Sequence, residues 1–245
     1  MVFPISDDDS DRRTVPYVNY ALIAINVLVF VAFQRFGNNE HFTYAWATVP
    51  EEIRTGKDID KPVEVIDPVT NRRFEIPLEP TPISVYLTLL TSMFLHGGIA
   101  HILGNMWFLW IFGDNVEDTL GHIRYLLFYL VCGVLASLAH VASVLVFHNN
   151  PYIPSLGASG AISGVMGGYL LLFPTKRVTV ILGRVLTEVP AFVAVGIWFL
   201  FQIISGLGAL GDSRPSGVAY GAHIGGFVAG LALVRVFGIG HEPGT

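Results

Sequence analysis

The sequence predicts an all-α membrane protein with six membrane-spanning helices and a long extramembrane loop after the first of them. Three observations predict this fold class. Of the 245 residues, 52% are hydrophobic and only 13% are charged, whereas about a quarter of the residues in soluble domains are charged. Mean hydropathy is +0.58. The apolar residues gather in separate runs, several of which approach the roughly 20 residues that a helix needs to cross a bilayer.

The chain begins with a polar and acidic tail, residues 1–16, and the first predicted span follows at residues 17–33. The tail lacks the short basic start of a cleaved signal peptide, and no convincing small-residue cleavage site follows the apolar run. The first span is therefore expected to remain in the protein. A short second tail is expected at residues 241–245, which leaves residues 17–240 as one membrane domain. No internal repeat divides this domain.

The long first loop is expected at about residues 35–95. It is charged and contains several prolines, so it is predicted to lie outside the bilayer. Within it, the alternating residues 63–67 and 73–77 predict a small hairpin. The last part of the loop, residues 85–95, is amphipathic, and we expect it to lie at the membrane interface and to lead into the second span.

Five further apolar runs predict the remaining spans, and short polar or glycine-containing turns separate them. Residues 113–121 form one of these predicted turns, and residues 206–217 form a flexible connection before the last span. Pro174 and the cations after it end the fourth span. The five spans are expected at about residues 99–112, 125–147, 156–173, 189–207 and 218–237.

The orientation in the membrane follows from the cations in short loops and near span ends, which are enriched on the cytoplasmic side. Arg35 and Arg214 fall on the side of the first loop. A larger set falls on the side of the termini: Arg12, Arg13, Arg124, Lys176, Arg177, Arg184 and Arg235. The sequence therefore predicts cytoplasmic termini in a multi-pass protein, with the cell (inner) membrane as its location and the first loop outside.

Polar side chains within a bilayer are costly, and they are therefore candidates for function. Ser137 and Ser143 are weak candidates. The stronger ones in spans two to six are His101, Asn105, His140, Ser159, Ser163, Gln202 and His223. His101 and Asn105 are four residues apart and share one face of a helix. His140 has no matched partner and is interpreted as a structural histidine.

Glycines give the fourth and sixth spans a face with almost no side chains. In the fourth span these are Gly157, Gly160, Gly164, Gly167 and Gly168, and in the sixth they are Gly226 and Gly230. Small residues allow two membrane helices to approach closely. Packing of these two faces would bring His223 towards Ser159.

This pair has the chemistry of a hydrolase. A serine hydroxyl becomes a useful nucleophile when a neighbouring base accepts its proton, and histidine is suited to that role near neutral pH. The oxyanion that forms in acyl transfer needs hydrogen-bond donors, which Asn105 and His101 can supply. No carboxylate lies within the spans to orient the histidine. The residues therefore predict a Ser159–His223 dyad.

The order of several short motifs resembles the rhomboid family of intramembrane serine proteases over residues 91–236. The motifs are Phe94-Leu-His96, His101-x-x-x-Asn105, Gly113 to Glu117, Gly157-Ala-Ser159-Gly160 and Ala222-His223-x-x-Gly226-x-x-x-Gly230. The resemblance implies a six-helix bundle that acts as a serine endopeptidase in the lipid bilayer and cleaves single-span transmembrane proteins.

The resemblance also implies the roles of individual residues. Ser159 would be the nucleophile and His223 the base, while His101, Asn105 and the backbone N–H of Ser159 would form the oxyanion site. No cofactor and no metal is implied. The chain departs from many members in two ways: its first loop lacks a Trp-Arg pair, and Ser163 stands where those members have a tyrosine that packs against the catalytic histidine.

The same residues bear on other classes of function. A catalytically silent rhomboid-like chaperone or client-binding protein is the main alternative, although such relatives usually lack the serine or the histidine. A transporter is less favoured, because no inverted repeat is present. A zinc protease is disfavoured by the lack of a His-Glu-x-x-His helix. Nucleic acid is not an expected partner, since no basic patch is present. The sequence sets no oligomeric state.

Overall fold

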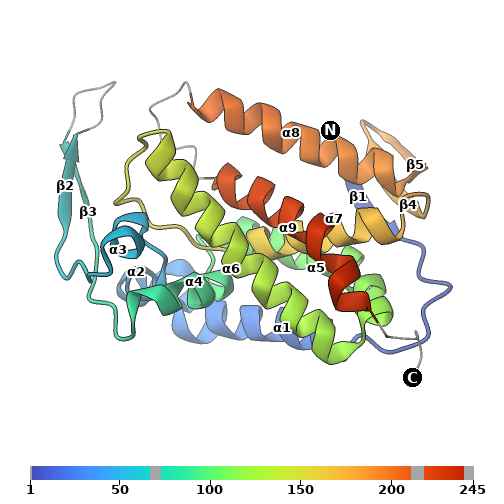
Figure 1. Ribbon diagram of the computed structural model, residues 1–245, viewed down its shortest axis with the longest axis horizontal. Helices are drawn as coiled ribbons and strands as arrows, with labels where there is room; N and C mark the ends of the chain where they lie inside the picture. Colours follow the sequence, from blue (N-terminus) through green and yellow to red (C-terminus); the bar gives the residue numbers. More distant parts are fainter. Residues whose placement is uncertain (1, 67–72, 211–217, 240–245) are drawn as a thin grey trace.

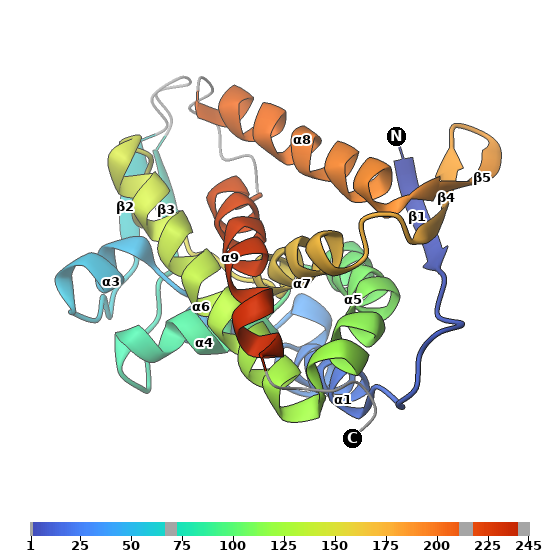
Figure 2. The same ribbon diagram turned by 45° about the vertical axis from the view of Figure 1, so that its right-hand side comes forward.

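The structure is a computed structural model that describes residues 2–66, 73–210 and 218–239. It is a bundle of helices in which the short helix α7 (Ser159–Leu172) contacts several longer neighbours. Figures 1 and 2 show α7 enclosed by the rest of the bundle, with α8 along one side and α1 on the opposite side. The six main helices are α1 (Tyr17–Leu28), α5 (Ile99–Leu120), α6 (His122–Val146), α7, α8 (Ala191–Leu210) and α9 (Tyr220–Gly238).

Helices α7 and α9 pack through the two predicted glycine faces. A Cβ atom built on Gly226 would lie 2.1 Å from the carbonyl oxygen of Gly160, and one built on Gly230 would lie 1.9 Å from that of Gly164. Real Cβ atoms do not come so close to a backbone oxygen, so only glycine fits at either position. The predicted packing of spans four and six is confirmed.

The region predicted as a long loop contains regular structure. Its hairpin is confirmed, with strands β2 and β3 antiparallel and Val63 paired with Ile76. Val49, Ile76 and Leu78 form a small separate core beneath it. The elements are α2 (Glu40–Trp46), α3 (Pro50–Thr55), β2 (Val63–Ile66), β3 (Arg73–Ile76), η3 (Val85–Leu87), α4 (Thr88–Thr91) and η4 (Ser92–Phe94). Residues 67–72 lie outside the described part of the chain.

A three-stranded antiparallel sheet lies at the other end of the bundle (Figure 1). Strand β1 (Val2–Asp7), from the predicted tail, pairs with β4 (Arg177–Leu182), which pairs in turn with β5 (Val185–Pro190). No strand was predicted here. The β4 segment alternates buried and exposed side chains only over its first residues, and its pairing with β1 is too distant in the sequence for local patterns to indicate it.

The predicted turn at residues 113–121 is wrong, because α5 continues as a helix to Leu120 and the chain turns only at Gly121. The polar side chains of this segment do not face solvent as turn residues would. Instead, Asp114 binds Arg12 at 2.5 Å and Asp118 accepts hydrogen bonds from Thr14. The helix can continue because residues of the N-terminal segment satisfy its polar groups.

Glu117, near the end of α5, binds backbone groups at the start of α1. It is fully buried and accepts hydrogen bonds from the backbone N–H groups of Val18, at 2.9 Å, and Asn19, at 2.7 Å. These N–H groups belong to the first turn of α1, where a helix has no partners of its own. His122 lies 2.5 Å from the same carboxylate.

Asp7 anchors the end of β1 against the bundle. Its carboxylate accepts hydrogen bonds from the Tyr169 hydroxyl, at 2.8 Å, and from the Asn115 side chain, at 2.7 Å. Burial, and after it the nearby Asp114 carboxylate, raise the pKa of Asp7 from 3.8 to about 7. Lys176 donates to the other side of the Asn115 amide at 2.7 Å. The N-terminal segment is thus bound to both α5 and α7.

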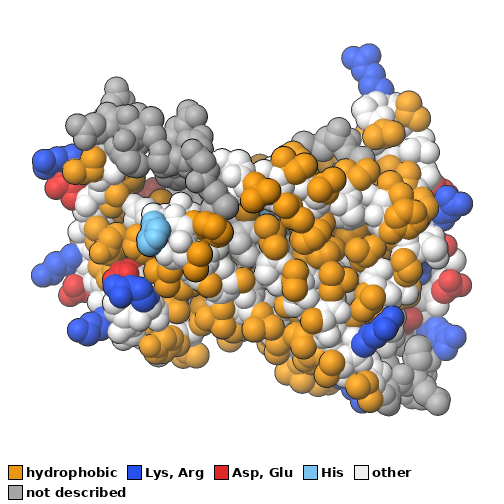
Figure 3. Space-filling model, turned by 45° about the horizontal axis from the view of Figure 1, so that its top comes forward, with side chains coloured by type: hydrophobic (Ala, Val, Ile, Leu, Met, Phe, Trp, Pro, Cys, Tyr) orange, Lys and Arg blue, Asp and Glu red, His pale blue; other side chains and the backbone are white. Residues whose placement is uncertain are grey.

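The chain is an integral membrane protein. In the described residues, three helices, α6, α8 and α9, are long and apolar enough to span a bilayer. The pair formed by residues Val85–Phe94 and Ile99–Leu120, bent by 81°, would make a fourth. Tyr17–Phe33 and Ser159–Leu172 are apolar but shorter. The space-filling view shows hydrophobic side chains over the middle of one face and charged ones towards its margins (Figure 3).

The predicted limits of the last two spans agree with the structure to within a few residues, except where the connection between them begins. Residues 206–210, which were expected in a flexible connection, form the end of α8. The rest of that connection, residues 211–217 with Arg214, lies outside the described part of the chain.

Candidate active site

Ser159 is the first residue of α7, and the chain before it has an unusual backbone conformation. Gly157 has φ of +126°, which favours glycine, and its N–H donates to the carbonyl of Ser92 at 2.9 Å. A Cβ at this position would also lie 2.9 Å from the ring of His101. Gly157 is therefore needed for the turn and for the close approach of His101.

The segment before α7 is held by the folded first loop. Thr48 and Ser155 exchange two backbone hydrogen bonds, of 3.0 and 2.8 Å, as an isolated antiparallel bridge. The Thr48 hydroxyl also donates to the carbonyl of Thr88 at 2.8 Å and lies 2.9 Å from the Ser92 hydroxyl. The turn that carries Ser159 is thus attached to residues more than 60 positions earlier in the chain.

The structure brings Ser159 and His223 together. The Nε2 atom of His223, on α9, lies 2.7 Å from the Oγ atom of Ser159, on α7. This is within the hydrogen-bond distance expected between a nucleophile and its base. The approach results from the glycine packing described above, because larger side chains at that interface would separate the two helices.

Gln202, on α8, contacts the other side of the His223 ring. Its Oε1 atom lies 2.8 Å from His223 Nδ1, and its side chain is buried. The indole ring of Trp198, one turn earlier on α8, lies with its centroid 6.1 Å from that of His223. Gln202 was predicted only as a polar candidate, without a role. The sequence did contain a signal for such a role, because Gln202 is the only amide side chain in the predicted fifth span.

His101 lies beside the serine. A Cβ atom at Gly157 would be within 2.9 Å of His101 Nε2 and 3.7 Å of Ser159 Oγ, so both groups border the same small space. The backbone N–H of Gly97 donates to His101 Nδ1 at 3.2 Å. Since a neutral imidazole carries one proton, this bond assigns that proton to Nε2. His101 can therefore act as a hydrogen-bond donor at the serine.

Two further kinds of hydrogen-bond donor are found here: the Asn105 side chain, on the same face of α5 as His101, and the backbone N–H groups at the start of α7. Asn105, one turn after His101 on α5, is 8% exposed, and its Nδ2 atom has no hydrogen-bond partner among the described residues. The first N–H groups of a helix have no intrahelical partners and carry its positive partial charge. Ser159 is at that end of α7. The arrangement can therefore stabilise a negative charge beside the serine.

Three other polar residues, Ser163, His96 and His140, differ in their hydrogen bonding. The Ser163 hydroxyl donates to the carbonyl of Ser159 at 2.6 Å, one turn back along α7. His96 is fully buried, and the Gln34 side chain binds both its backbone N–H, at 2.8 Å, and its carbonyl, at 3.0 Å. His140 lies on α6, and its Nδ1 atom has no hydrogen-bond partner in the described part of the chain. None of the three has a hydrogen bond to the Ser159 or His223 side chain in the described structure.

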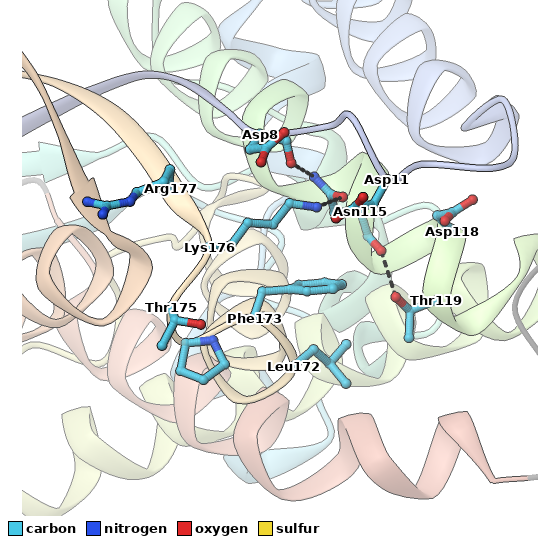
Figure 4. A pocket seen from close by; sticks show the side chains of 11 residues that line it. Asp8, Asp11, Asn115, Asp118, Thr119, Leu172, Phe173, Thr175, Lys176 and Arg177 are labelled. Carbon is cyan, nitrogen blue, oxygen red and sulfur yellow. Dashed lines mark hydrogen bonds between the residues drawn. The ribbon is translucent and has the colours of Figure 1, made fainter.

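A pocket of about 380 Å³ lies at the opposite end of α7. Figure 4 shows its lining, in which Asp8 and Asp11 of the N-terminal segment lie beside Asn115 and Lys176, and the Asn115 side chain donates a hydrogen bond to the carbonyl of Asp8. At a rise of 1.5 Å per residue, it is roughly 20 Å from Ser159. Among the described residues, no group of three His, Cys, Asp or Glu side chains could hold a metal ion.

These features define a class: a helical membrane protein with a hydrogen-bonded serine and histidine between two closely packed helices. Comparison with known families agrees with this class. The sequence model of the family described as "Rhomboid domain" matches residues 84–239, which are more than half of the chain. The protein belongs to the rhomboid family.

The chain is similar to several curated relatives. It is 33% identical to "Rhomboid protease GluP" of Bacillus subtilis over 151 residues, which are 62% of this chain and 26% of the relative. It is 36% identical to "RHOMBOID-like protein 4" of Arabidopsis thaliana over 152 residues, 59% of this chain and 32% of the relative. Over 213 residues, 86% of this chain, it is 27% identical to "Rhomboid protein 1, mitochondrial" of Saccharomyces cerevisiae, 51% of which is covered. The chain thus spans from about a quarter to half the length of these relatives.

Proposed function

We propose that this protein is an intramembrane serine endopeptidase that uses a Ser159–His223 dyad. The single observation that carries the proposal is the 2.7 Å distance between Ser159 Oγ and His223 Nε2 inside a membrane helix bundle. Membership of the rhomboid family, and the name of the protease relative from Bacillus subtilis, support the same conclusion.

In the proposed mechanism, His223 Nε2 accepts the proton of the Ser159 hydroxyl while Oγ attacks the carbonyl carbon of the scissile peptide bond. The carbonyl oxygen becomes an oxyanion, which His101 Nε2–H, Asn105 Nδ2–H and the Ser159 backbone N–H stabilise. The C–N bond then breaks as His223 returns the proton to the leaving amine. This leaves an acyl ester on Ser159. Water, deprotonated by His223, attacks the ester carbonyl to form a second tetrahedral intermediate. When this intermediate collapses, His223 returns the proton to Ser159 Oγ, which releases the second product and restores the hydroxyl.

The proposed substrates are single-span transmembrane proteins, whose scissile bonds would reach Ser159 within or near the bilayer. Six membrane segments, including the two shorter apolar helices, would form one domain from residue 17 to 240. This domain would lie in the cell membrane, with both termini on the cytoplasmic side. The bundle supports this arrangement because β2–β3 and the β1–β4–β5 sheet lie at opposite ends (Figure 1). Cysteines introduced at Lys57 and at Arg177, in a Cys132→Ser background, test it. Labelling of position 177 from outside would contradict it.

Cleavage of a model single-span substrate by purified protein in liposomes tests the proposed activity. The wild-type protein should cleave it, and the Ser159→Ala variant should bind it without cleaving. A chelator should leave the rate unchanged, because the proposed chemistry uses no metal. Substrate binding with no cleavage by the wild-type protein would favour the client-binding alternative instead.

A further inference from the structure

We infer that Gln202 is a positioning residue that fixes the tautomer and the orientation of His223. The inference rests on the proposed function and extends it, since the dyad would then depend on a third side chain from a third helix. The observation behind it is the 2.8 Å distance between Gln202 Oε1 and His223 Nδ1, on the side of the ring opposite to Ser159.

The hydrogen-bonding capacity of the two groups explains why this contact matters. A neutral imidazole carries its proton on one nitrogen, and the partner of that nitrogen selects which one. Gln202 Oε1 can only accept, so Nδ1 must carry the proton. Nε2 of His223 is then left unprotonated towards Ser159 Oγ. With the other tautomer, Nε2 would already carry a proton and could not accept one from the serine.

The amide oxygen also suits the location. When His223 takes the proton of Ser159, both ring nitrogens carry hydrogen, and Gln202 Oε1 remains an acceptor for Nδ1–H. In soluble serine proteases a buried aspartate has this position. A carboxylate within a bilayer carries a large desolvation cost, whereas a neutral amide orients the ring without an added charge. Gln202 is 7% exposed, so water has little access to compete with it.

Gln202 lies on a helix that contacts His223 at two successive turns. Trp198 is four residues earlier on the same face of α8, with its ring next to that of His223. The outward side chains of this part of α8, such as Leu200 and Phe201, are exposed in the described structure. The orientation of His223 therefore depends on α8 staying in contact with α9.

Two substitutions at Gln202 separate a positioning role from a packing role, because the two roles predict opposite orders of activity. Gln202→Met keeps the size and replaces the amide oxygen with a thioether, which is only a weak acceptor, so it should lower kcat about 10- to 1,000-fold with KM little changed. This loss is smaller than the ~10⁴-fold loss for a triad aspartate, because the amide is neutral. Gln202→Glu keeps an acceptor at the same length and should retain activity within about tenfold of wild type.

A packing role predicts that methionine is tolerated and that glutamate is not. Ser205→Ala, on the same helix without a bond to His223, serves as the matched control and should behave like wild type. Melting curves identify any variant that has not folded. A folded Gln202→Met variant with wild-type kcat overturns the inference, and so does a folded Gln202→Glu variant that is less active than Gln202→Met.

A second measurement makes the inference testable apart from substrate cleavage. The rate at which a fluorophosphonate probe labels Ser159 needs the serine and its base but no transmembrane substrate. Labelling of Gln202→Met that is slower by the same 10- to 1,000-fold supports the inference. It does so even if the wild type cleaves no tested substrate, and in that case only the proposed function fails. Absence of Ser159 labelling in the wild type overturns both.

Discussion

Helices α8 and α9 both contact the candidate dyad, but they are attached to the bundle in different ways. The glycines of α9 meet backbone atoms of α7, and a Cβ at Gly226 or Gly230 would overlap a carbonyl oxygen. On α8, a Cβ at Gly196 or Gly208 would have nothing within 4 Å among the described residues. The distance between Ser159 and His223 is therefore set by tight backbone packing, whereas the orientation of His223 depends on side chains from a loosely packed helix.

The largest effect is expected from removing the base itself, on the tightly packed helix. His223→Ala should lower kcat by up to about 10⁶-fold, because a serine without its base is a poor nucleophile. The double variant Ser159→Ala/His223→Ala should be no worse than either single variant, since the two residues act as a unit. Cleavage kinetics measure this, with melting curves as the control for folding. Substantial activity in His223→Ala would show that another group is the base.

The next largest effect tests the packing difference directly with a matched pair of substitutions. Gly226→Val should lower both stability and turnover, because the new side chain overlaps the carbonyl of Gly160 and overpacking typically costs about 1–3 kcal/mol or more. Gly196→Val, on α8, should leave melting temperature and turnover near those of wild type. Equal melting temperatures for the two variants would show that α9 is not packed more tightly than α8.

A third helix, α5, provides the candidate oxyanion donors and allows a similar test. Asn105→Ala should lower kcat about ten- to a thousandfold with little change in KM, because the donated bond matters chiefly after charge develops. If Asn105 only holds helices together, its loss should instead lower stability by roughly 0.6 kcal/mol with normal kcat. Kinetics beside melting curves distinguish the two roles, with His101→Ala measured in parallel.

The smallest effect is expected at the β1–β4–β5 sheet, which directly precedes α8 and attaches it to the N-terminal segment. The unfolded chain releases the Asp7 proton near its ordinary pKa of 3.8, whereas the folded protein holds it up to about pH 7. The stabilising contribution of protonated Asp7 is complete below the lower value, and it is lost as pH rises through the upper one. The N-terminal segment, and with it the β1–β4–β5 sheet, should loosen between about pH 6 and 8.

Hydrogen exchange of residues 2–14 across this pH range measures the loosening. Asp7→Asn should remove the pH dependence, whereas Asp8→Asn, at an exposed neighbour, should leave it in place. The glycine contacts of α9 contain no titrating group and should show no matching change. Exchange that is independent of pH in the wild-type protein would contradict the assigned role of Asp7.

The sequence was sufficient to predict the parts of the molecule that depend on local patterns. The apolar runs predicted the helices, alternation predicted the β2–β3 hairpin, and the glycine rows predicted the contact of α7 with α9 that brings Ser159 to His223. Each of these signals comes from spacing within one short segment, which a helix or strand converts directly into a shared face.

The features that were missed depend on contacts between distant segments. Residues 113–120 contain enough polar side chains to resemble a turn, and they remain helical because residues distant in the sequence, such as Arg12 and Thr14, satisfy their polar groups. The pairing of β1 with β4 joins residues about 170 to 180 positions apart, such as Val2 with Leu182. Gln202 was visible as a polar side chain in an apolar run, but its role required the position of His223 on the next helix.

The bond between Glu117 and the start of α1 also has a consequence for biosynthesis. The carboxylate that accepts the Val18 and Asn19 N–H groups lies 98 to 99 residues later in the chain. At a ribosomal rate of about 5–20 residues per second, Glu117 is made roughly 5–20 s after the residues that it binds. During that interval the first turn of α1 must hydrogen-bond to water. The first helix of the protein is thus finished only when the end of α5 emerges and folds against it.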